Sequence, residues 1–351
     1  MKKSLLALAV FGAFAGAASA QSNVSIYGVV DAGVQYVNDG NPAGKTVGLE
    51  SGLQSGSRIG FKGTEDLGGG LSAIFTLENG FSADTGKLGQ GDRLFGRQAW
   101  VGVAGGFGAV KLGRQQTALY SSLLAIDPFS INLAGNAQKV FGSGLYALDP
   151  LARTDNTLSY TTANFGGFSG SVSYGFGEKA GDNKANRNIG AGAQYANGPV
   201  NVQFAYQKSN VALSDAFAAD FGVTANPAVE IKTALIGATY DFGVAKAHAG
   251  FADTKLALFG DEVKNRNYLL GLSAPVGAAG TVMASYVRND YKDIDNAKSD
   301  QYALGYTHAL SKRTNLYTSY SYLKNEDNAF VRAYDFGKNV RTFNVGMRHQ
   351  F

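Results

Sequence analysis

The chain has 351 residues, with 31 lysines and arginines against 27 aspartates and glutamates, and it contains no cysteine. This near balance of charge gives no support to a nucleic-acid-binding protein, which concentrates positive charge. Without cysteine, neither a disulfide framework nor a thiolate metal site can form.

The first twenty residues have the pattern of a secretory signal peptide. Lys2 and Lys3 precede the apolar residues 5–17, and small residues follow at 18–20, where a signal peptidase cuts. We expect the mature chain to begin near Gln21, which leaves 331 of the 351 residues, and to be exported. No later apolar run reaches the roughly 18 residues that a membrane-spanning helix requires.

Residues 56–78 have the pattern of a β-hairpin whose strands each carry one apolar and one polar face. In the first strand Ile59 and Phe61 alternate with Arg58 and Lys62, and a glycine-rich turn leads into a second alternating strand. Because side chains on a strand alternate sides with a period of two, the pattern separates an apolar surface from a polar one.

The rest of the chain repeats this alternation, and its joints are of two kinds that alternate strictly. Seven joints are short, at residues 65–70, 104–108, 164–167, 197–199, 241–244, 275–280 and 309–313. Eight are longer and polar, near residues 38–55, 82–92, 116–152, 178–187, 209–228, 254–265, 290–299 and 324–338. Fifteen joints give sixteen strands, with both termini on the short-turn side. Short turns at one rim and long loops at the other are typical of outer-membrane barrels.

A soluble β-sandwich is the alternative, since it also alternates apolar and polar residues. A sandwich would point its apolar faces inward, whereas a barrel in lipid turns them outward around a polar lumen. Glycine and serine on the polar faces, an export signal and the lack of cysteine favour the barrel. The sequence therefore predicts an all-β, sixteen-stranded antiparallel transmembrane barrel in one domain, residues 21–351.

Three segments carry a family resemblance: SRIGFKGTEDLGGGLSAIFTLENGF, RQAWVGVAGGFGAVKLGRQ and the closing VGMRHQF. They are similar to the general diffusion porins of Gram-negative bacteria, in the neisserial and β-proteobacterial branch, and the likeness covers the whole chain. The resemblance implies a homotrimer in the outer membrane, among its lipids and lipopolysaccharide, through which small hydrophilic solutes and ions diffuse passively. It also implies that the third long extracellular loop, residues 116–152, folds inward and narrows the channel.

Porins of this class set arginines on the channel wall against acidic residues on the inserted loop, and such charges give a passive channel its selectivity. Carried over by motif, the wall arginines are Arg58, Arg97 and Arg153. Arg58 and Arg97 would lie about 18 to 20 Å above the periplasmic rim, at about 3.3 Å per residue, and Arg153 higher. The alternative is that each arginine is an ordinary solvated lumen residue.

The strand that follows Arg97 fits this assignment poorly. An inward Arg97 would place Gln98 outward, together with Trp100. It would also turn Val101 and Val103 inward. The resemblance, and not the periodicity, therefore decides the side on which Arg97 lies.

On the inserted loop, Asp127 in the run IDPFS is the expected acidic partner, because Pro128 fixes the backbone beside it. The alternative is an ordinary turn-opening aspartate. Where some relatives carry a basic residue after the Tyr-Gly of the first strand, this chain has Val29. Basic residues still outnumber acidic ones on the expected lumen face, which predicts a weak preference for anions. The lumen charges of second rank in this count are Asp31, Lys62, Lys111 and Asp155.

Two further residues have expected roles outside the lumen. Arg114 falls on the apolar side of its strand, where a lone arginine in lipid is costly, so we expect it at a subunit interface; the alternative is that it reaches into the headgroups. The terminal Phe351 resembles the signal that the barrel assembly machinery of the outer membrane recognises in its clients. It can also serve as one more ring of the periplasmic aromatic girdle.

An enzyme is not expected, and neither is a cofactor, a metal or a nucleic-acid partner. His248, His308 and His349 all fall beside short turns or the C-terminus, away from the long loops where a surface hydrolase would act, and they lack metal-ligand spacing. Three functions stay open at this point. They are a general diffusion porin, a substrate-specific channel for small anionic solutes, and a closed barrel that serves as an enzyme or adhesin.

Overall fold

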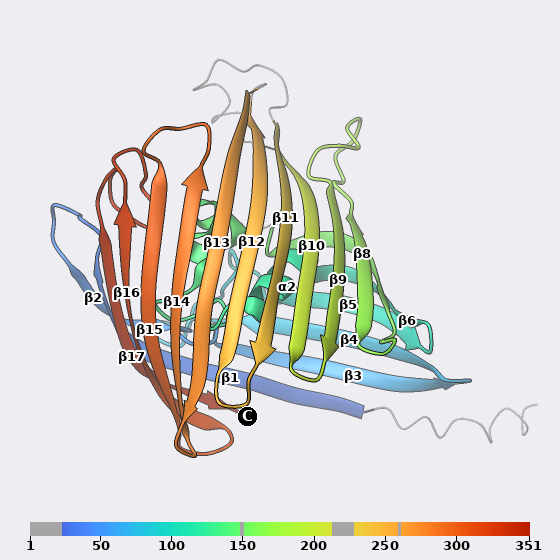
Figure 1. Cartoon of the computed structure of the whole chain (residues 1–351). Coiled ribbons are helices and arrows are strands. Elements are labelled where there is room, and N and C mark those ends of the chain that lie inside the picture. The colour runs from blue at the N-terminus through green and yellow to red at the C-terminus, as the bar shows by residue number, and fades with distance from the viewer. Residues whose placement is uncertain (1–22, 148–150, 213–227, 259–260) are drawn as a thin grey trace, which may run out of the picture.

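The protein is an antiparallel β-barrel in the computed structural model, which describes residues 23–147, 151–212, 228–258 and 261–351 (Figure 1). The expected signal peptide, residues 1–20, lies outside the described residues. The strands are β1 (Asn23–Asn38), β2 (Thr46–Ser51), β3 (Arg58–Gly68), β4 (Leu71–Gly80), β5 (Gln98–Gly105), β6 (Gly108–Gln116), β7 (Arg153–Thr162), β8 (Phe168–Gly175), β9 (Asn188–Asn197), β10 (Val200–Ala212), β11 (Ala228–Asp241), β12 (Lys246–Leu258), β13 (Asp261–Val276), β14 (Gly280–Tyr291), β15 (Lys298–Ala309), β16 (Thr314–Asn325) and β17 (Val340–Gln350).

The first strand closes the barrel. On one side β1 pairs with β17, from Val29 opposite Gln350 to Asn38 opposite Arg341. On its other side, the C-terminal half of β1 pairs with β2 and its N-terminal half pairs with β3. The two short strands β2 and β3 therefore occupy a single strand position in the barrel. Counted by strand position, with β2 and β3 as one, the described residues form a closed sixteen-stranded barrel, which confirms the predicted strand number and antiparallel order.

The break between β2 and β3 has a specific cause. The carboxylate of Asp31, which is fully buried on β1, accepts the backbone N–H groups of Gln54 at 2.9 Å and Ser55 at 2.6 Å. It also accepts the hydroxyl of Tyr317 at 2.6 Å, from across the barrel closure. These bonds hold the irregular residues 52–57 against the wall and fix where β3 begins, at Arg58.

The joints follow the predicted alternation with two corrections. The predicted long loop at 254–265 is mostly strand, because β12 and β13 stay paired from Thr254 opposite Asn265 up to Leu258 opposite Asp261. The predicted loop at 38–55 contains β2. Charged residues misled the first prediction, since a strand that rises above the apolar band can carry charges on its outer face. The short turns stand as expected, and Gly68, Gly69 and Gly70 all adopt positive φ, which only glycine adopts freely.

The apolar faces of the strands point outward. On β17, Phe343, Val345 and Met347 are 44 to 50% exposed, whereas the intervening Thr342 and Asn344 are fully buried. The same alternation runs along the other strands of the barrel. It contradicts the alternative of a soluble β-sandwich, whose apolar faces would point inward. No helix within the described residues reaches the length and apolarity that a membrane span requires.

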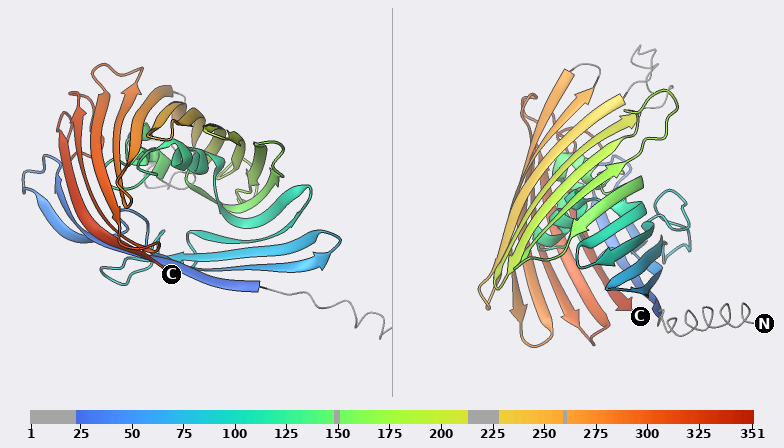
Figure 2. Two further views of the ribbon diagram at one scale, coloured as in Figure 1. Left: turned by 60° about the horizontal axis from the view of Figure 1, so that its bottom comes forward. Right: turned by 90° about the vertical axis from the view of Figure 1, so that its right-hand side faces the viewer.

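The described part of the segment between β6 and β7, residues 117–147, lies inside the ring of strands (Figure 2). It contains α2 (Ala118–Ile126), η1 (Ala137–Lys139) and η2 (Phe141–Ala147). The hydroxyl of Thr117 caps α2 by accepting the backbone N–H of Tyr120. Apolar side chains of this segment pack against inward-facing residues of β10 to β13, which makes a small dry core that the sequence analysis did not foresee. The core includes Leu119, Leu123, Ile126, Phe141, Ala205, Leu235, Ala252 and Leu269.

Candidate functional site

A carboxylate on β4 joins two arginines on the inner wall. Glu78 Oε1 accepts a hydrogen bond from Arg97 Nε at 2.7 Å, and Glu78 Oε2 lies 3.7 Å from Arg58 Nε. The hydroxyl of Tyr27, on β1, donates to Glu78 Oε2 at 2.8 Å. Both oxygens of one acid are therefore shared among two cations and a phenol, so the cluster of Tyr27, Arg58, Glu78 and Arg97 keeps a net positive charge.

Glycines make room for this cluster. Gly60 stands opposite Tyr27 on one side and opposite Glu78 on the other. A Cβ at Gly60 would lie 2.4 Å from the Tyr27 ring, so only glycine lets the tyrosine cross β3 to reach Glu78. The Arg97 side chain likewise occupies the space that a Cβ at Gly56 would take, 2.9 Å from Nη1. The glycines of this wall thus set the positions of its charges.

Arg153 links this wall to the inner segment. Its Nε donates to the carbonyl of Arg97 at 3.2 Å, and its guanidinium carbon lies 5.3 Å from the ring centre of Tyr120 on α2. The structure therefore brings the three predicted arginines, Arg58, Arg97 and Arg153, into one group. From the opposite side, α2 exposes Ser121 and Leu124.

The expected orientation of the strand after Arg97 is wrong. Glu78 is opposite Gln98, and Thr76 is opposite Trp100, so both of these β5 residues face the lumen. Val101 is 57% exposed on the outer face. Arg97 reaches Glu78 all the same, because it precedes the regular strand and does not take part in its alternation.

Asp127 does not act as the acidic partner of these arginines. Its carboxylate is buried and accepts the backbone N–H groups of Phe129, Ile131 and Ala137 at 2.9 to 3.1 Å. Burial raises the pKa of Asp127 to about 6, although the three N–H donors favour its ionised form. It is the anchor of a turn, which was the alternative reading of the sequence, and Glu78 is the acid that faces the arginines.

Asp31 is likewise not a solvated lumen charge, because the bonds that fix the break after β2 occupy it. Directly opposite Asp31, Arg348 of β17 donates to Asn315 Oδ1 at 2.9 Å and to Ser55 Oγ at 3.0 Å. Arg348 was not predicted as a lumen residue, although the alternation of the last strand places it on the inner face. Glu78, which lies between Arg58 and Arg97, was likewise not among the predicted lumen charges.

Asp155 and Arg114 meet near the long-loop rim. Arg114 Nη1 contacts Asp155 Oδ1 at 2.7 Å, and Arg114 Nε donates to the carbonyl of Gly96 at 2.7 Å. Arg93, from the same loop as Gly96, also pairs with Asp155 at 2.8 Å. These partners belong to Arg114's own chain, and its predicted subunit contact stays a prediction. These two arginines more than offset the charge of Asp155, which therefore adds little negative field to the lumen.

The two predicted lysines lie on the lumen face, each over an aromatic ring. Lys62 Nζ is 5.5 Å from the ring centre of Tyr27, and Lys111 Nζ is 4.4 Å from that of Trp100. Within the described part of the chain, neither lysine has a carboxylate oxygen within 4 Å. No carboxylate of the described residues therefore offsets the charge of either lysine toward a solute.

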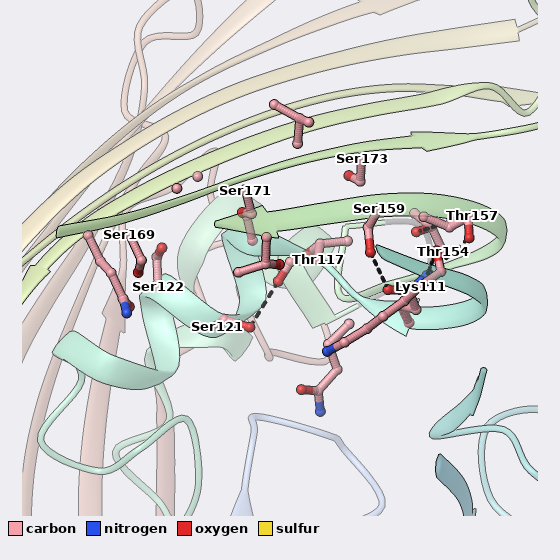
Figure 3. A pocket seen from close by; sticks show the side chains of 18 of the residues that line it. Lys111, Thr117, Ser121, Ser122, Thr154, Thr157, Ser159, Ser169, Ser171 and Ser173 are labelled. Carbon is pink, nitrogen blue, oxygen red and sulfur yellow. Dashed lines mark hydrogen bonds between the residues drawn. The ribbon is translucent and has the colours of Figure 1, made fainter. Parts of the chain in front are cut away.

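Lys111 lines a polar recess of about 270 Å³ between α2 and strands β5 to β10 (Figure 3). The residues around it include no carboxylate. Hydroxyl groups dominate its surface, from Thr117, Ser121, Ser122, Thr154, Thr157, Ser159, Thr161, Ser169, Ser171 and Ser173.

His248 is a structural group. It lies on β12 with its ring inside the barrel, where Nδ1 is 3.0 Å from the carbonyl oxygen of Ile126 and Nε2 is 3.0 Å from Ser273 Oγ. It thereby ties the end of α2 to the wall. Among the described residues no group of three or more histidine, cysteine, aspartate or glutamate side chains could hold a metal ion.

Comparison with known proteins gives consistent matches. The family described as Gram-negative porin matches residues 6–328. Outer membrane porin protein 32 of Delftia acidovorans is 38% identical, and major outer membrane protein P.IB of Neisseria meningitidis is 29% identical, each with both chains fully covered. The solved structure of an anion-selective porin from Comamonas acidovorans superposes with a TM-score of 0.82 at 35% identity, covering 94% of this chain and 100% of that one.

Proposed function

The chain belongs to the Gram-negative porin family, and we propose that its arginine-lined lumen is a water-filled channel for passive diffusion of small hydrophilic solutes, with a preference for anions. The barrel crosses the Gram-negative outer membrane with its strands. Members of this family are channels, and the chain is accordingly a channel and not an enzyme. The outward apolar faces and the polar inner faces of the strands agree with this placement.

The observation that carries the anion preference is the group formed by Arg58, Arg97 and Arg153. The guanidinium groups of Arg58 and Arg97 share one carboxylate, that of Glu78, and Arg153 donates to the carbonyl of Arg97 beside them, at the wall that faces α2. The acids expected to offset them, Asp31 and Asp127, are engaged by backbone N–H groups instead. Fixed positive charge at a narrow passage lowers the barrier for anions and raises it for cations. The inner segment, residues 116–152, would provide the opposite side of this passage as the constriction loop.

A planar-bilayer measurement tests the proposal. The purified protein should insert in discrete conductance steps, and a tenfold KCl gradient should give a reversal potential of the sign expected for chloride permeation. A reversal potential that indicates a preference for potassium would contradict the anion preference. An absence of conductance steps would contradict the channel itself and favour the closed barrel.

The recess around Lys111 favours a second candidate, a substrate-specific channel for small anionic solutes. One ammonium group without a carboxylate, next to many hydroxyl groups, suits an acidic solute that also carries hydroxyls. This candidate predicts that gluconate, added to KCl, lowers the conductance in a saturable way. A conductance that falls only with the mobility of the larger anion supports a general diffusion porin.

Three partners remain part of the proposal. The family resemblance supports a homotrimer, which should survive SDS on unheated gels and dissociate on heating. It also supports insertion by the barrel assembly machinery and contact with outer-membrane lipids and lipopolysaccharide. The long loops then face the cell exterior, and both termini lie at the periplasmic rim.

A further inference from the structure

Four lysines stand in one line across four neighbouring strands of the outer wall. Lys208 on β10 is directly opposite Lys232 on β11, Lys232 is opposite Lys255 on β12, and Lys255 is opposite Lys264 on β13. These strands lie side by side at the front of Figure 1. With about 4.8 Å between strands, this lysine row spans about 14 Å.

The lysine row faces outward. Ser209, Thr233 and Thr254, each next to a lysine of the row in sequence, are at most 1% exposed and point inside the barrel. Thr254 Oγ1, for example, bonds the hydroxyl of Tyr146 of the inner segment. Because side chains on a strand alternate sides, the four lysines point away from the lumen and contribute nothing to the passage.

Like charges directly opposite one another on paired strands destabilise a sheet. The lysine row offsets part of this repulsion with glutamates. Glu230 contacts Lys208 Nζ at 2.6 Å and Lys232 Nζ at 2.5 Å, and Glu262 contacts Lys255 Nζ at 3.4 Å. Lys264 has no ion pair within the described residues. Among the described residues, four lysines against two glutamates leave two positive charges of the row without a counter-ion.

The row also lies at a definite height on the wall. Each lysine is three or four residues from the end of its strand at the long-loop rim. Below it, the rings of Phe251 and Tyr268 pack at 5.2 Å on the outer face. Further down the same wall is an apolar groove of about 670 Å³, whose outward-facing lining includes Ala238, Tyr240, Ala249, Leu270 and Leu272. Lys232 and Ala238 are six residues apart, or about 20 Å along the strand.

We propose that the lysine row binds the phosphate groups of an acylated, phosphorylated glycolipid of the outer leaflet, whose acyl chains lie on the apolar wall below. Ammonium groups are strong partners for phosphate oxygens, and the two uncompensated charges match a headgroup that carries phosphates. The aromatic and apolar surface beneath the row favours a lipid-bound phosphate over a free one. The phosphates of one lipid can bind the lysine row while its acyl chains cover the apolar surface below. This inference rests on the proposed outer-membrane orientation, with the long loops outward.

Binding of lipid A, a doubly phosphorylated and acylated glucosamine disaccharide, to the refolded protein in detergent tests the proposal by native mass spectrometry. The double variant Lys232→Gln/Lys255→Gln should weaken binding about tenfold. The matched control Lys246→Gln/Lys312→Gln removes the same charge at the short-turn rim and should change binding less than about twofold. Glu230→Gln, which removes a counter-charge from the row, should instead tighten binding.

Three results would overturn the assignment: equal binding by the row variant and the wild type, equal binding of lipid A stripped of its phosphates, or displacement by millimolar inorganic phosphate. The last result would identify a site for free anions. Unchanged heat-modifiable gel mobility shows that each variant has folded, and Glu230→Gln provides an independent readout if the double variant does not fold. Conductance steps in planar bilayers report on the channel separately, so loss of glycolipid binding with normal conductance counts against this inference alone.

Discussion

Glu78 sets how much positive charge the lumen wall presents. Its two oxygens contact Arg97 and Arg58, and Tyr27 supplies a further donor to the oxygen that faces Arg58. A carboxylate held in this way keeps two guanidinium groups close together that would otherwise repel each other. It also cancels one of the positive charges that a passing anion encounters. Glu78 therefore stabilises the arrangement of the arginines but lowers the preference of the channel for anions.

Replacing Glu78 with glutamine should raise the preference for anions. The change removes one negative charge between Arg58 and Arg97 and keeps the shape of the side chain, so the chloride-to-potassium permeability ratio should rise roughly twofold. Reversal potentials in a KCl gradient measure this ratio. Glu65→Gln, which removes the same charge near the short-turn rim, serves as the control and should leave the ratio nearly unchanged. A ratio unaffected by Glu78→Gln would show that the cluster does not border the permeation path.

Asp127 should make the attachment of its turn depend on pH. Because burial raises the pKa of Asp127 to about 6, the folded turn binds a proton more tightly than the unfolded chain does between about pH 4 and pH 6. Its contribution to stability is therefore largest below about pH 4 and declines as the pH rises to about 6. The full difference is at most about 3 kcal/mol, at about 1.4 kcal/mol per pKa unit.

Hydrogen exchange of the amides that Asp127 accepts, those of Ile131 and Ala137, measures this effect. After correction for intrinsic exchange rates, protection should fall between pH 4 and pH 6.5 and then stay level. In Asp127→Asn the side chain no longer titrates, and the protection of these amides should become independent of pH over this range. Protection that increases with pH would contradict the raised pKa.

At the scale of elements, glycines on the wall decide where the inner segment sits. A Cβ at Gly237 would lie 2.3 Å from Ile126 Cδ1, one at Gly271 would lie 2.6 Å from Pro128 Cγ, and one at Gly305 would lie 2.7 Å from Phe129 Cε1. These wall glycines, on β11, β13 and β15, thus make room for three side chains at the end of α2 and in the turn that follows it. These contacts hold the inner segment against the side of the barrel wall that carries the three glycines. The opposite side of the wall, which carries the arginines, stays open to solute.

Truncating Phe129 to alanine should loosen this attachment. Phe129 is 3% exposed, and removal of a buried phenyl ring costs about 3 to 5 kcal/mol. The inner segment should then leave the wall more often, which should appear as greater open-channel noise and faster proteolysis within residues 116–147. Leu124→Ala is a matched control, because Leu124 lies on α2 with 36% exposure and does not pack against a glycine of the barrel wall. Equal noise in both variants would show that Phe129 is not the anchor.

The sequence predicted the elements well where alternation alone determines them, and less well where charges or loops intervene. Residues 254–265 read as a loop because Lys255 and Lys264 are charged, yet they continue β12 and β13 above the apolar band. The partners of Asp127 and Asp31 could not be read from the sequence, since backbone N–H groups leave no signature in side-chain patterns. Arg97 shows the converse, because its motif identified a wall residue that the periodicity placed on the wrong face.

For the whole molecule, the number of strands, their order and their outward apolar faces could be predicted from the sequence. Each strand repeats the same alternation of apolar and polar residues. Closure of the ring depends on a few residues at its ends. Phe351 and Gly28 exchange two backbone hydrogen bonds, at 3.0 and 3.1 Å. The Phe351 ring fills the space beside Gly28, where a Cβ would lie 2.2 Å from Cζ. The last residue of the chain therefore completes the seam between the first and last strands.

Removing Phe351 should weaken the barrel in two separable ways. In synthetic vesicles without assembly factors, loss of the two hydrogen bonds to Gly28 should lower the free energy of unfolding by about 2 kcal/mol, at about 1 kcal/mol per bond. In cells, the level of folded protein in the outer membrane should fall several-fold more than that loss explains, because Phe351 is also the proposed assembly signal. Phe343→Ala controls for the loss of an aromatic ring from the outer face of the same strand. Unchanged stability in vesicles would contradict the role in closure, whereas a normal level in cells would contradict the role as a signal.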